Sequence, residues 1–154
     1  VVRPLSEALA AGSVDAICAS EPTPSLAESR GSKPFAELAG LGNNYPILLM
    51  ASERFVKAHP DQVVTFLRAM AQATRLVAEH PEETAGILAQ VSGLDRDLGL
   101  RAMKRHSYVL TLNDSIIESL TQTGSSLVAH GTIPEMPGIR EFTHPALLKR
   151  ALSK

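Results

Sequence analysis

Cysteine, clustered basic residues and long apolar runs are what this sequence lacks most clearly. The only cysteine is Cys18, so an internal disulfide is excluded, although one cysteine does not identify a redox compartment. Lysine and arginine number 15 against 16 aspartate and glutamate residues, and no basic cluster is present. Because phosphate contacts need clustered cations, we expect no nucleic-acid partner. No apolar stretch reaches the length of a membrane span, and no signal peptide is visible.

Motifs for catalysis or cofactor binding are also missing. The sequence contains no G-x-S-x-G, P-loop or GxGxxG pattern. No two of its histidines have the spacing of a zinc site, and His59, His80 and His130 directly precede a proline or a glycine at a helix boundary. We therefore predict no catalytic residue, no metal and no cofactor.

What is present is the composition of one globular domain, with 44% hydrophobic and 20% charged residues in 154. The chain starts at Val1 rather than at a methionine and runs almost at once into a predicted helix. We therefore expect it to be a fragment of a longer protein.

The rest of the chain is organised around residues 8–22, ALAAGSVDAICASEP. Gly12 is suited to end a helix, and residues 14–19 form an apolar run typical of a buried parallel strand, with Cys18 inside it. Pro22 is well placed to open the next helix. Because ligands collect beyond the carboxyl ends of strands in open α/β sheets, Glu21 is a candidate site residue.

Periodicity and helix signals extend this α/β prediction along the chain. Further strands are predicted at residues 33–38 and 45–51, and helices at 4–11, 22–30, 53–58, 60–80, 81–93, 95–105, 114–130 and 145–152. The long helix from residue 60 is amphipathic, and Met70 on its apolar face is predicted to be buried. The composition shifts at residues 39–44, and the chain after residue 45 is predicted to be mostly helical.

The order of these elements resembles a known family. The stretch ALAAGSVDAICASEP, then YPILLMASERFVKAHPDQVVTFLRAMAQATRLVAEHPEETAGILAQVSGL, then NDSIIESLTQTGSSLVAHGTIPE, is similar to the substrate-binding proteins of nitrate, sulfonate, taurine and thiamine-precursor ABC transporters. Each motif alone is weak, and their shared order and spacing carry the resemblance.

The resemblance implies the C-terminal portion of a two-lobed periplasmic-binding fold of type II. Residues 1–40 would be a strand–helix–strand remnant of the second lobe, and residues 41–154 the returning part of the first lobe. It also implies a periplasmic or other extracytoplasmic, membrane-associated protein that captures a small organic or anionic solute and delivers it to a membrane permease. Two alternatives stay open: a thiamine pyrimidine precursor synthesis enzyme on the same fold, and a ligand-sensing domain of a signalling protein.

Five residues are candidate solute contacts: Ser20, Glu21, Thr23, Asn44 and Tyr45. The first three surround the predicted helix start, where they could instead simply cap the helix. Asn44 and Tyr45 follow the lobe crossing and could equally form a hinge or turn. If Glu21 contacts the solute, Glu21→Gln should weaken binding by about 1–3 kcal/mol. If it is a cap, stability should fall instead.

Overall fold

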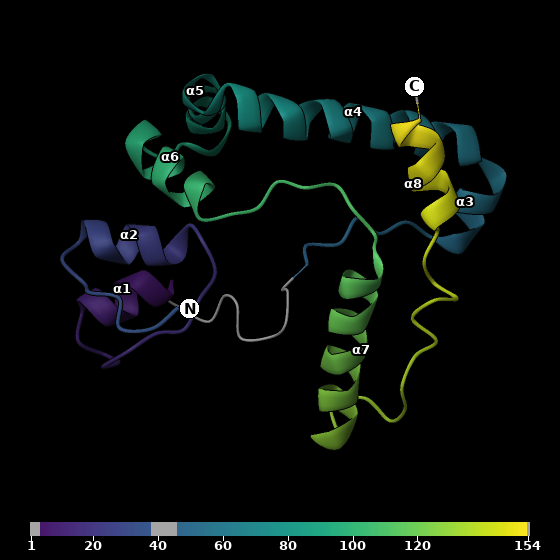
Figure 1. The fold of residues 1–154 in the computed structure, drawn as a ribbon. Coiled ribbons are helices and arrows are strands. Elements are labelled where there is room, and N and C mark those ends of the chain that lie inside the picture. The colour runs from purple at the N-terminus through teal and green to yellow at the C-terminus, as the bar shows by residue number, and fades with distance from the viewer. Residues whose placement is uncertain (1–3, 38–45, 154) are drawn as a thin grey trace. The chain divides into compact units, whose positions relative to one another are not determined.

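The computed structural model describes residues 4–37 and 46–153, and it is helical (Figure 1). Eight helices lie within these ranges: α1 (Leu5–Ala10), α2 (Thr23–Ser29), α3 (Glu53–Ala58), α4 (Pro60–Glu79), α5 (Pro81–Ser92), α6 (Arg96–Lys104), α7 (Asp114–Ala129) and α8 (Pro145–Leu152). Each corresponds to a helix predicted from the sequence, with ends that differ by at most one or two residues. The prediction of a mostly helical chain after residue 45 is confirmed.

Short-range signals explain where several of these helices begin and end. The Ser52 side chain accepts a hydrogen bond from the Phe55 amide at 3.3 Å, and Asn113 accepts one from the Ile116 amide at 3.0 Å. Such bonds satisfy amide groups that the first turn leaves without a partner. At the end of α1, Gly12 has a φ of 67°, a conformation that glycine adopts without steric cost.

The predicted strands are not strands in the structure. Residues 14–19, the described part of 33–38 and residues 46–51 run without a strand assignment, and no described residue belongs to a strand. An apolar run becomes a strand only where neighbouring strands accept its backbone hydrogen bonds. The described residues supply no such neighbour, so the strand predictions for these segments were wrong, whereas the α/β fold class stays a prediction.

Contacts divide the chain into two units, which are described separately. Unit 1 contains the described residues 4–37 and 74–108, and unit 2 contains residues 46–73 and 109–153. The lobe boundary at residue 40 stays a prediction, because this division by contacts does not test it.

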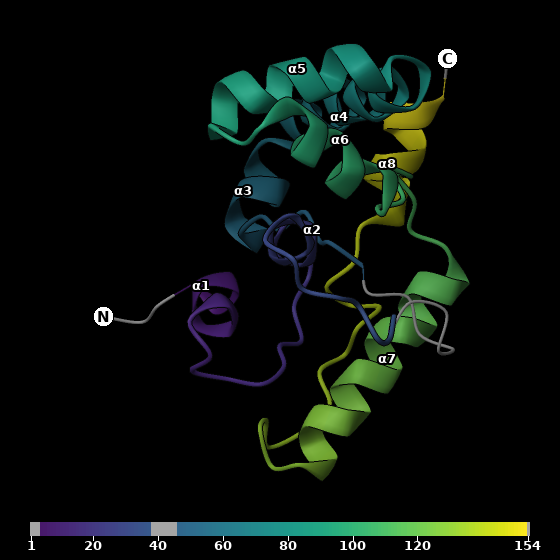
Figure 2. The same cartoon turned by 90° about the vertical axis from the view of Figure 1, so that its left-hand side faces the viewer.

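Unit 1 is held together by helices that pack closely. The backbone of α1 lies against α2, α2 against α6, and α6 against α5 (Figures 1 and 2). Small or slender side chains fill these contacts: its buried residues are Ser6, Ser25, Ala27, Ala85, Leu98, Gly99, Ala102 and Met103. Small residues let helix backbones approach each other, so a compact helical unit forms although it buries few large side chains.

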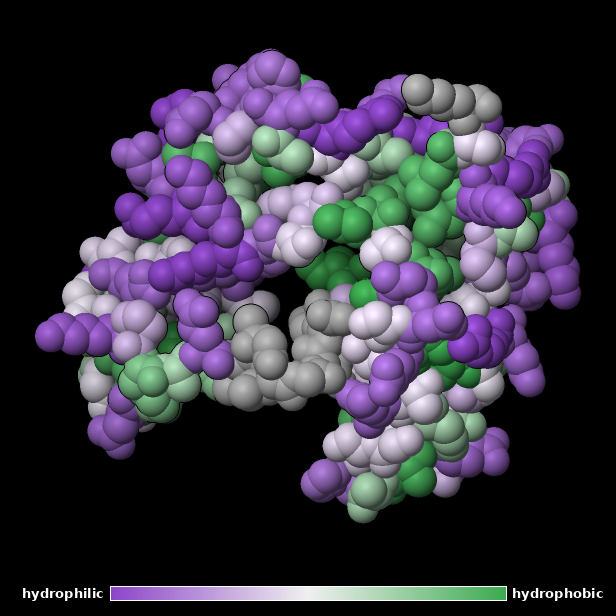
Figure 3. Space-filling model, viewed as in Figure 1, coloured by the Kyte–Doolittle hydropathy of each residue, from purple (hydrophilic) through white to green (hydrophobic). Residues whose placement is uncertain are grey.

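Unit 2 exposes much more of its apolar surface. Ile47 and Met50 are 80% and 87% exposed, and Phe55, Phe66 and Phe142 are also exposed in this unit, as Phe35 is in unit 1. Figure 3 shows apolar side chains open to solvent around α8 and the segment 109–113. Its buried residues are few: Val56, Val64, Ile117, Ser119, Gly124 and Ala151.

Two burial predictions need correction. Met70, expected inside, is only half-buried, and Phe66 on the same face is 54% exposed, whereas Val64 is the buried residue of α4. Cys18, expected as a small buried side chain, is exposed. Both errors have one cause: an apolar pattern shows which face can be covered, and burial requires another element to cover it.

Candidate functional site

The site predicted around Glu21 lies in unit 1, where residues 13–20 lead into α2. Ser20 is exposed, Thr23 is half-buried as the first residue of α2, and the Glu21 side chain is only 9% exposed. Asn44 and Tyr45, the other two predicted contacts, lie outside the described residues. The structure therefore brings together Ser20, Glu21 and Thr23, which are also neighbours in the sequence.

Both carboxylate oxygens of Glu21 have partners. The Ser25 amide donates to Glu21 Oε2 at 3.2 Å, and Arg105 Nη1 donates to Glu21 Oε1 at 2.8 Å. The first bond satisfies an amide of the first turn of α2, so Glu21 does serve as a helix-start acceptor. Glu21 also forms an ion pair with Arg105. The two alternatives drawn from the sequence, a solute contact and a helix cap, did not include this role.

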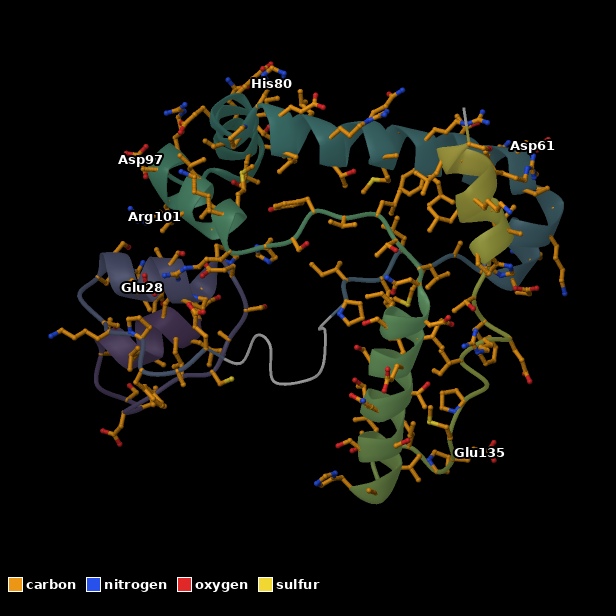
Figure 4. All side chains as sticks on the ribbon, in the orientation of Figure 1. Glu28, Asp61, His80, Asp97, Arg101 and Glu135 are labelled. Carbon is orange, nitrogen blue, oxygen red and sulfur yellow. The ribbon has the colours of Figure 1, made fainter. Side chains whose placement is uncertain are left out.

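Arg105 follows the last residue of α6 and reaches a second carboxylate on α2. Its Nη1 and Nη2 atoms donate to Glu28 Oε1 and Oε2, each at 2.9 Å, a bidentate arrangement. Arg105 Nη1 also lies 3.4 Å from the hydroxyl of Ser25, which is completely buried. We call Glu21, Ser25, Glu28 and Arg105 the α2–α6 cluster; Figure 4 labels Glu28 on α2.

The cluster changes the ionisation of its members. Burial alone raises the pKa of the Glu21 carboxyl, but hydrogen bonds from Arg105 and Ser25 outweigh burial, and the net pKa is lowered. The pKa of Arg105 is raised, first by its hydrogen bonds to Glu28 and then by those to Glu21. Glu21 is therefore a carboxylate at neutral pH, next to the charged guanidinium of Arg105.

Sequence reasoning missed Glu28 and also Arg105, the member that connects the others. Arg105 is 84 residues away from Glu21, and it was read only as the end of a helix. Its position at the end of α6 suits a cation, which the helix dipole favours there. That local signal explains why a basic residue stands at 105, but it does not identify the carboxylates that Arg105 binds.

Unit 2 has an open groove of about 440 Å³, lined by residues 110–112 and by α8, and none of the described predicted contacts lines it. Within the described residues, no group of three histidine, cysteine, aspartate or glutamate side chains is placed to hold a metal ion. No helix in the described part of the chain is long and apolar enough to cross a membrane.

Comparison with known proteins gives one relative and one family. The putative aliphatic sulfonates-binding protein of Bacillus subtilis (strain 168) is 24% identical over 145 residues, which are 93% of this chain and 44% of that protein. The chain thus spans less than half the length of this relative. No solved structure matches. Residues 1–84, more than half of the chain, match the family described as NMT1/THI5 like, and the chain therefore belongs to the NMT1/THI5-like family.

Proposed function

We propose that this chain is part of the solute-binding component of an ABC importer, which captures a small organic or anionic solute outside the cytoplasm and delivers it to a membrane permease. The observation that carries the proposal is the family match over residues 1–84. The relative in Bacillus subtilis, named as a sulfonates-binding protein, supports it over nearly the whole chain. A binding role also agrees with the absence of a catalytic motif in the sequence.

The proposed solute class is the one that the sequence resemblance implied: nitrate, sulfonates, taurine or a thiamine precursor. The proposed fold is the C-terminal portion of a two-lobed binding protein, with residues 1–40 in one lobe and 41–154 in the other. Closure of two lobes on the solute would present the loaded form to the permease.

The proposed contacts are Ser20, Glu21 and Thr23, with Asn44 and Tyr45 from the segment outside the described residues. The exposed Ser20 hydroxyl can both donate and accept a hydrogen bond. Glu21 offers a solute little surface, because 9% of its side chain is exposed and both oxygens have partners. Ser20 and Thr23 are therefore the proposed main solute contacts at this end of α2. Glu21 is proposed to contact the solute only through the small exposed part of its side chain.

Calorimetric titration of the full polypeptide encoded by the gene tests this proposal. The panel is taurine, a short alkanesulfonate, nitrate and an aminopyrimidine, each followed for binding heat and for chemical conversion. We expect one of them to bind without being converted. Ser20→Ala should weaken that binding by about 0.5–1.5 kcal/mol, the net value of one hydrogen bond.

The matched control is Ser29→Ala at the other end of α2, where the hydroxyl bonds to the Leu26 carbonyl. It should leave the affinity unchanged. Turnover of a pyrimidine precursor would favour the enzyme alternative instead. If no panel member binds, and cells that lack the gene import all four solutes normally, the transport proposal is wrong.

A further inference from the structure

Arg105 joins parts of unit 1 that are far apart in the sequence. Its guanidinium bonds to Glu21, which precedes α2, and to Glu28, in the last turn of α2. The side chains of Glu21 and Glu28, near opposite ends of α2, therefore meet at one guanidinium at the end of α6. The backbones of these two helices also pack against each other, so the cluster lies at an established helix contact.

The geometry of the cluster favours an arginine over a lysine. Three bonds of 2.8–2.9 Å leave Nη1 and Nη2 in two directions, toward two different carboxylates. A guanidinium is a planar fork that can bind Glu28 through both nitrogens while Nη1 also reaches Glu21. A lysine ammonium is a point charge on a flexible stem, so it can hold the two carboxylates only with poorer geometry.

Loss of Arg105 would remove the cation that bonds to Glu21 Oε1 and would leave the Ser25 amide as the remaining bonded partner described for this carboxylate. The Glu21 side chain is 9% exposed, whereas that of Glu28 is 24% exposed. A buried carboxylate without its cation either takes up a proton or moves toward water. Such movement would break the bonds that hold the Glu21 side chain at the first turn of α2, next to Ser20 and Thr23.

We infer that Arg105 is a positioning residue, which holds Glu21 at the first turn of α2 and so fixes Ser20 and Thr23 for contact with the solute. The solute part of this inference rests on the proposed function. The part that concerns the link between α2 and α6 does not, and the experiments below separate the two.

The charged groups around Glu21 come from three helices. Arg105 and the neutral Ser25 bond to it directly, and Glu28 shares Arg105. The other titratable or charged residues on the described helices packed against α2, and next to Arg105, are Glu7, Arg96, Asp97, Arg101, Lys104 and His106. Arg96 bonds to Glu82, and the His106 ring contacts the Ala102 carbonyl.

The first experiment is a double-mutant cycle on the unfolding midpoint, with Arg105→Met, Glu21→Gln and the double variant. If the pair is coupled, the double variant loses clearly less than the sum of the two single losses. Arg105→Lys should recover part of the loss, and it keeps the test usable if Arg105→Met does not fold. Arg101→Met is the control, because Arg101 is exposed in the last turn of α6. It should leave the unfolding midpoint almost unchanged. Additive losses would overturn the link.

The second readout is the dependence of stability on pH, which a packing role alone would not change. The folded pKa of Glu21 is lowered, so its contribution is present above the ordinary value of 4.5 and is lost as the pH falls through the folded pKa. We expect the acid loss of stability to become shallower in both Arg105→Met and Glu21→Gln, and to stay unchanged in Arg101→Met. An identical acid profile in all variants would contradict the inference.

The third readout is the affinity for the panel solute that binds, measured at pH 7. Arg105→Met should weaken it at least fivefold, Arg105→Lys should weaken it less, and Arg101→Met should not change it. Wild-type affinity in Arg105→Met, together with a coupled cycle, would leave the link intact and overturn the positioning role. If the wild type binds no panel solute and cells that lack the gene import all four normally, the proposed function and the positioning role both fail, and the cycle alone decides the link.

Discussion

The two units use different means to hold their helices. In unit 1, α1, α2, α5 and α6 pack backbone against backbone through small residues, and the α2–α6 cluster reinforces the contact. In unit 2, described helices do not pack in this way, and ion pairs such as Arg150–Asp61 at 2.7 Å and Arg140–Asp114 at 2.9 Å connect separate segments. These pairs are exposed, and exposed pairs contribute only about 0–1 kcal/mol each. We expect unit 1 to contribute more stability per residue than unit 2.

Methionine truncation should give the largest difference between the units. Met103 in unit 1 is 6% exposed and Met50 in unit 2 is 87% exposed, so the same substitution probes a buried and an open site. Met103→Ala should lower the free energy of unfolding by about 2–5 kcal/mol, and Met50→Ala by less than about 0.5 kcal/mol. Denaturant unfolding measures both.

Met70→Ala is the intermediate member of this series, because Met70 is half-buried. Its loss should fall between those of Met103→Ala and Met50→Ala. Equal losses at Met103 and Met50 would show that the difference in packing between the two units is absent in solution.

Helix capping should give a smaller difference. Asp95 at the start of α6 accepts bonds from the Asp97 and Leu98 amides, both at 3.0 Å, whereas Asn113 accepts one bond at the start of α7. Asp95→Ala should cost about 1–2 kcal/mol and Asn113→Ala about 0.5–1 kcal/mol, because α6 is packed and cannot relieve the loss by fraying. Thermal unfolding compares them. A larger loss for Asn113→Ala would reverse the ranking of the two units.

Two helical glycines should respond to different extents to the same change. A methyl group at Gly86 in α5 would meet open space, whereas one at Gly124 in α7 would lie 2.7 Å from Met136 Sδ. Gly86→Ala should stabilise by about 0.5–1 kcal/mol through helix propensity and reduced unfolded-state entropy. At Gly124 the displacement of the flexible Met136 side chain should cancel most of that gain. A gain at Gly124 equal to that at Gly86 would show that Met136 moves away freely.

Thiol labelling of Cys18 should have the smallest effect on stability. It tests whether residues 14–19 of unit 1 are exposed. The structure exposes Cys18, in a segment that the sequence predicted to be a covered strand. A thiol reagent should therefore modify it at nearly the same rate in native protein as in denaturant. Strong protection in the native protein would show that residues 14–19 are covered in solution, as the sequence predicted.

The sequence predicted what depends on short-range interactions. Proline at helix starts, glycine after helix ends and capping side chains such as Ser52 and Asn113 act within one turn, so all the described helices could be placed from residue order. The strand predictions for residues 14–19 and 46–51 failed because an apolar run is not sufficient to form a strand. A second segment must pair with it and exchange backbone hydrogen bonds, and the local sequence does not show whether one does.

By itself, the sequence determined the helices, their order and the position of Glu21 just before α2, because these follow from backbone preferences and nearby side chains. Only the tertiary structure decided which apolar faces are covered, with Val64 inside and Phe66 outside on one helix. It alone decided the partner of Glu21, since 84 residues separate it from Arg105. An ion pair between residues so far apart in the sequence depends on how α6 packs on α2. Local sequence signals act within about one helical turn, so they do not predict this packing.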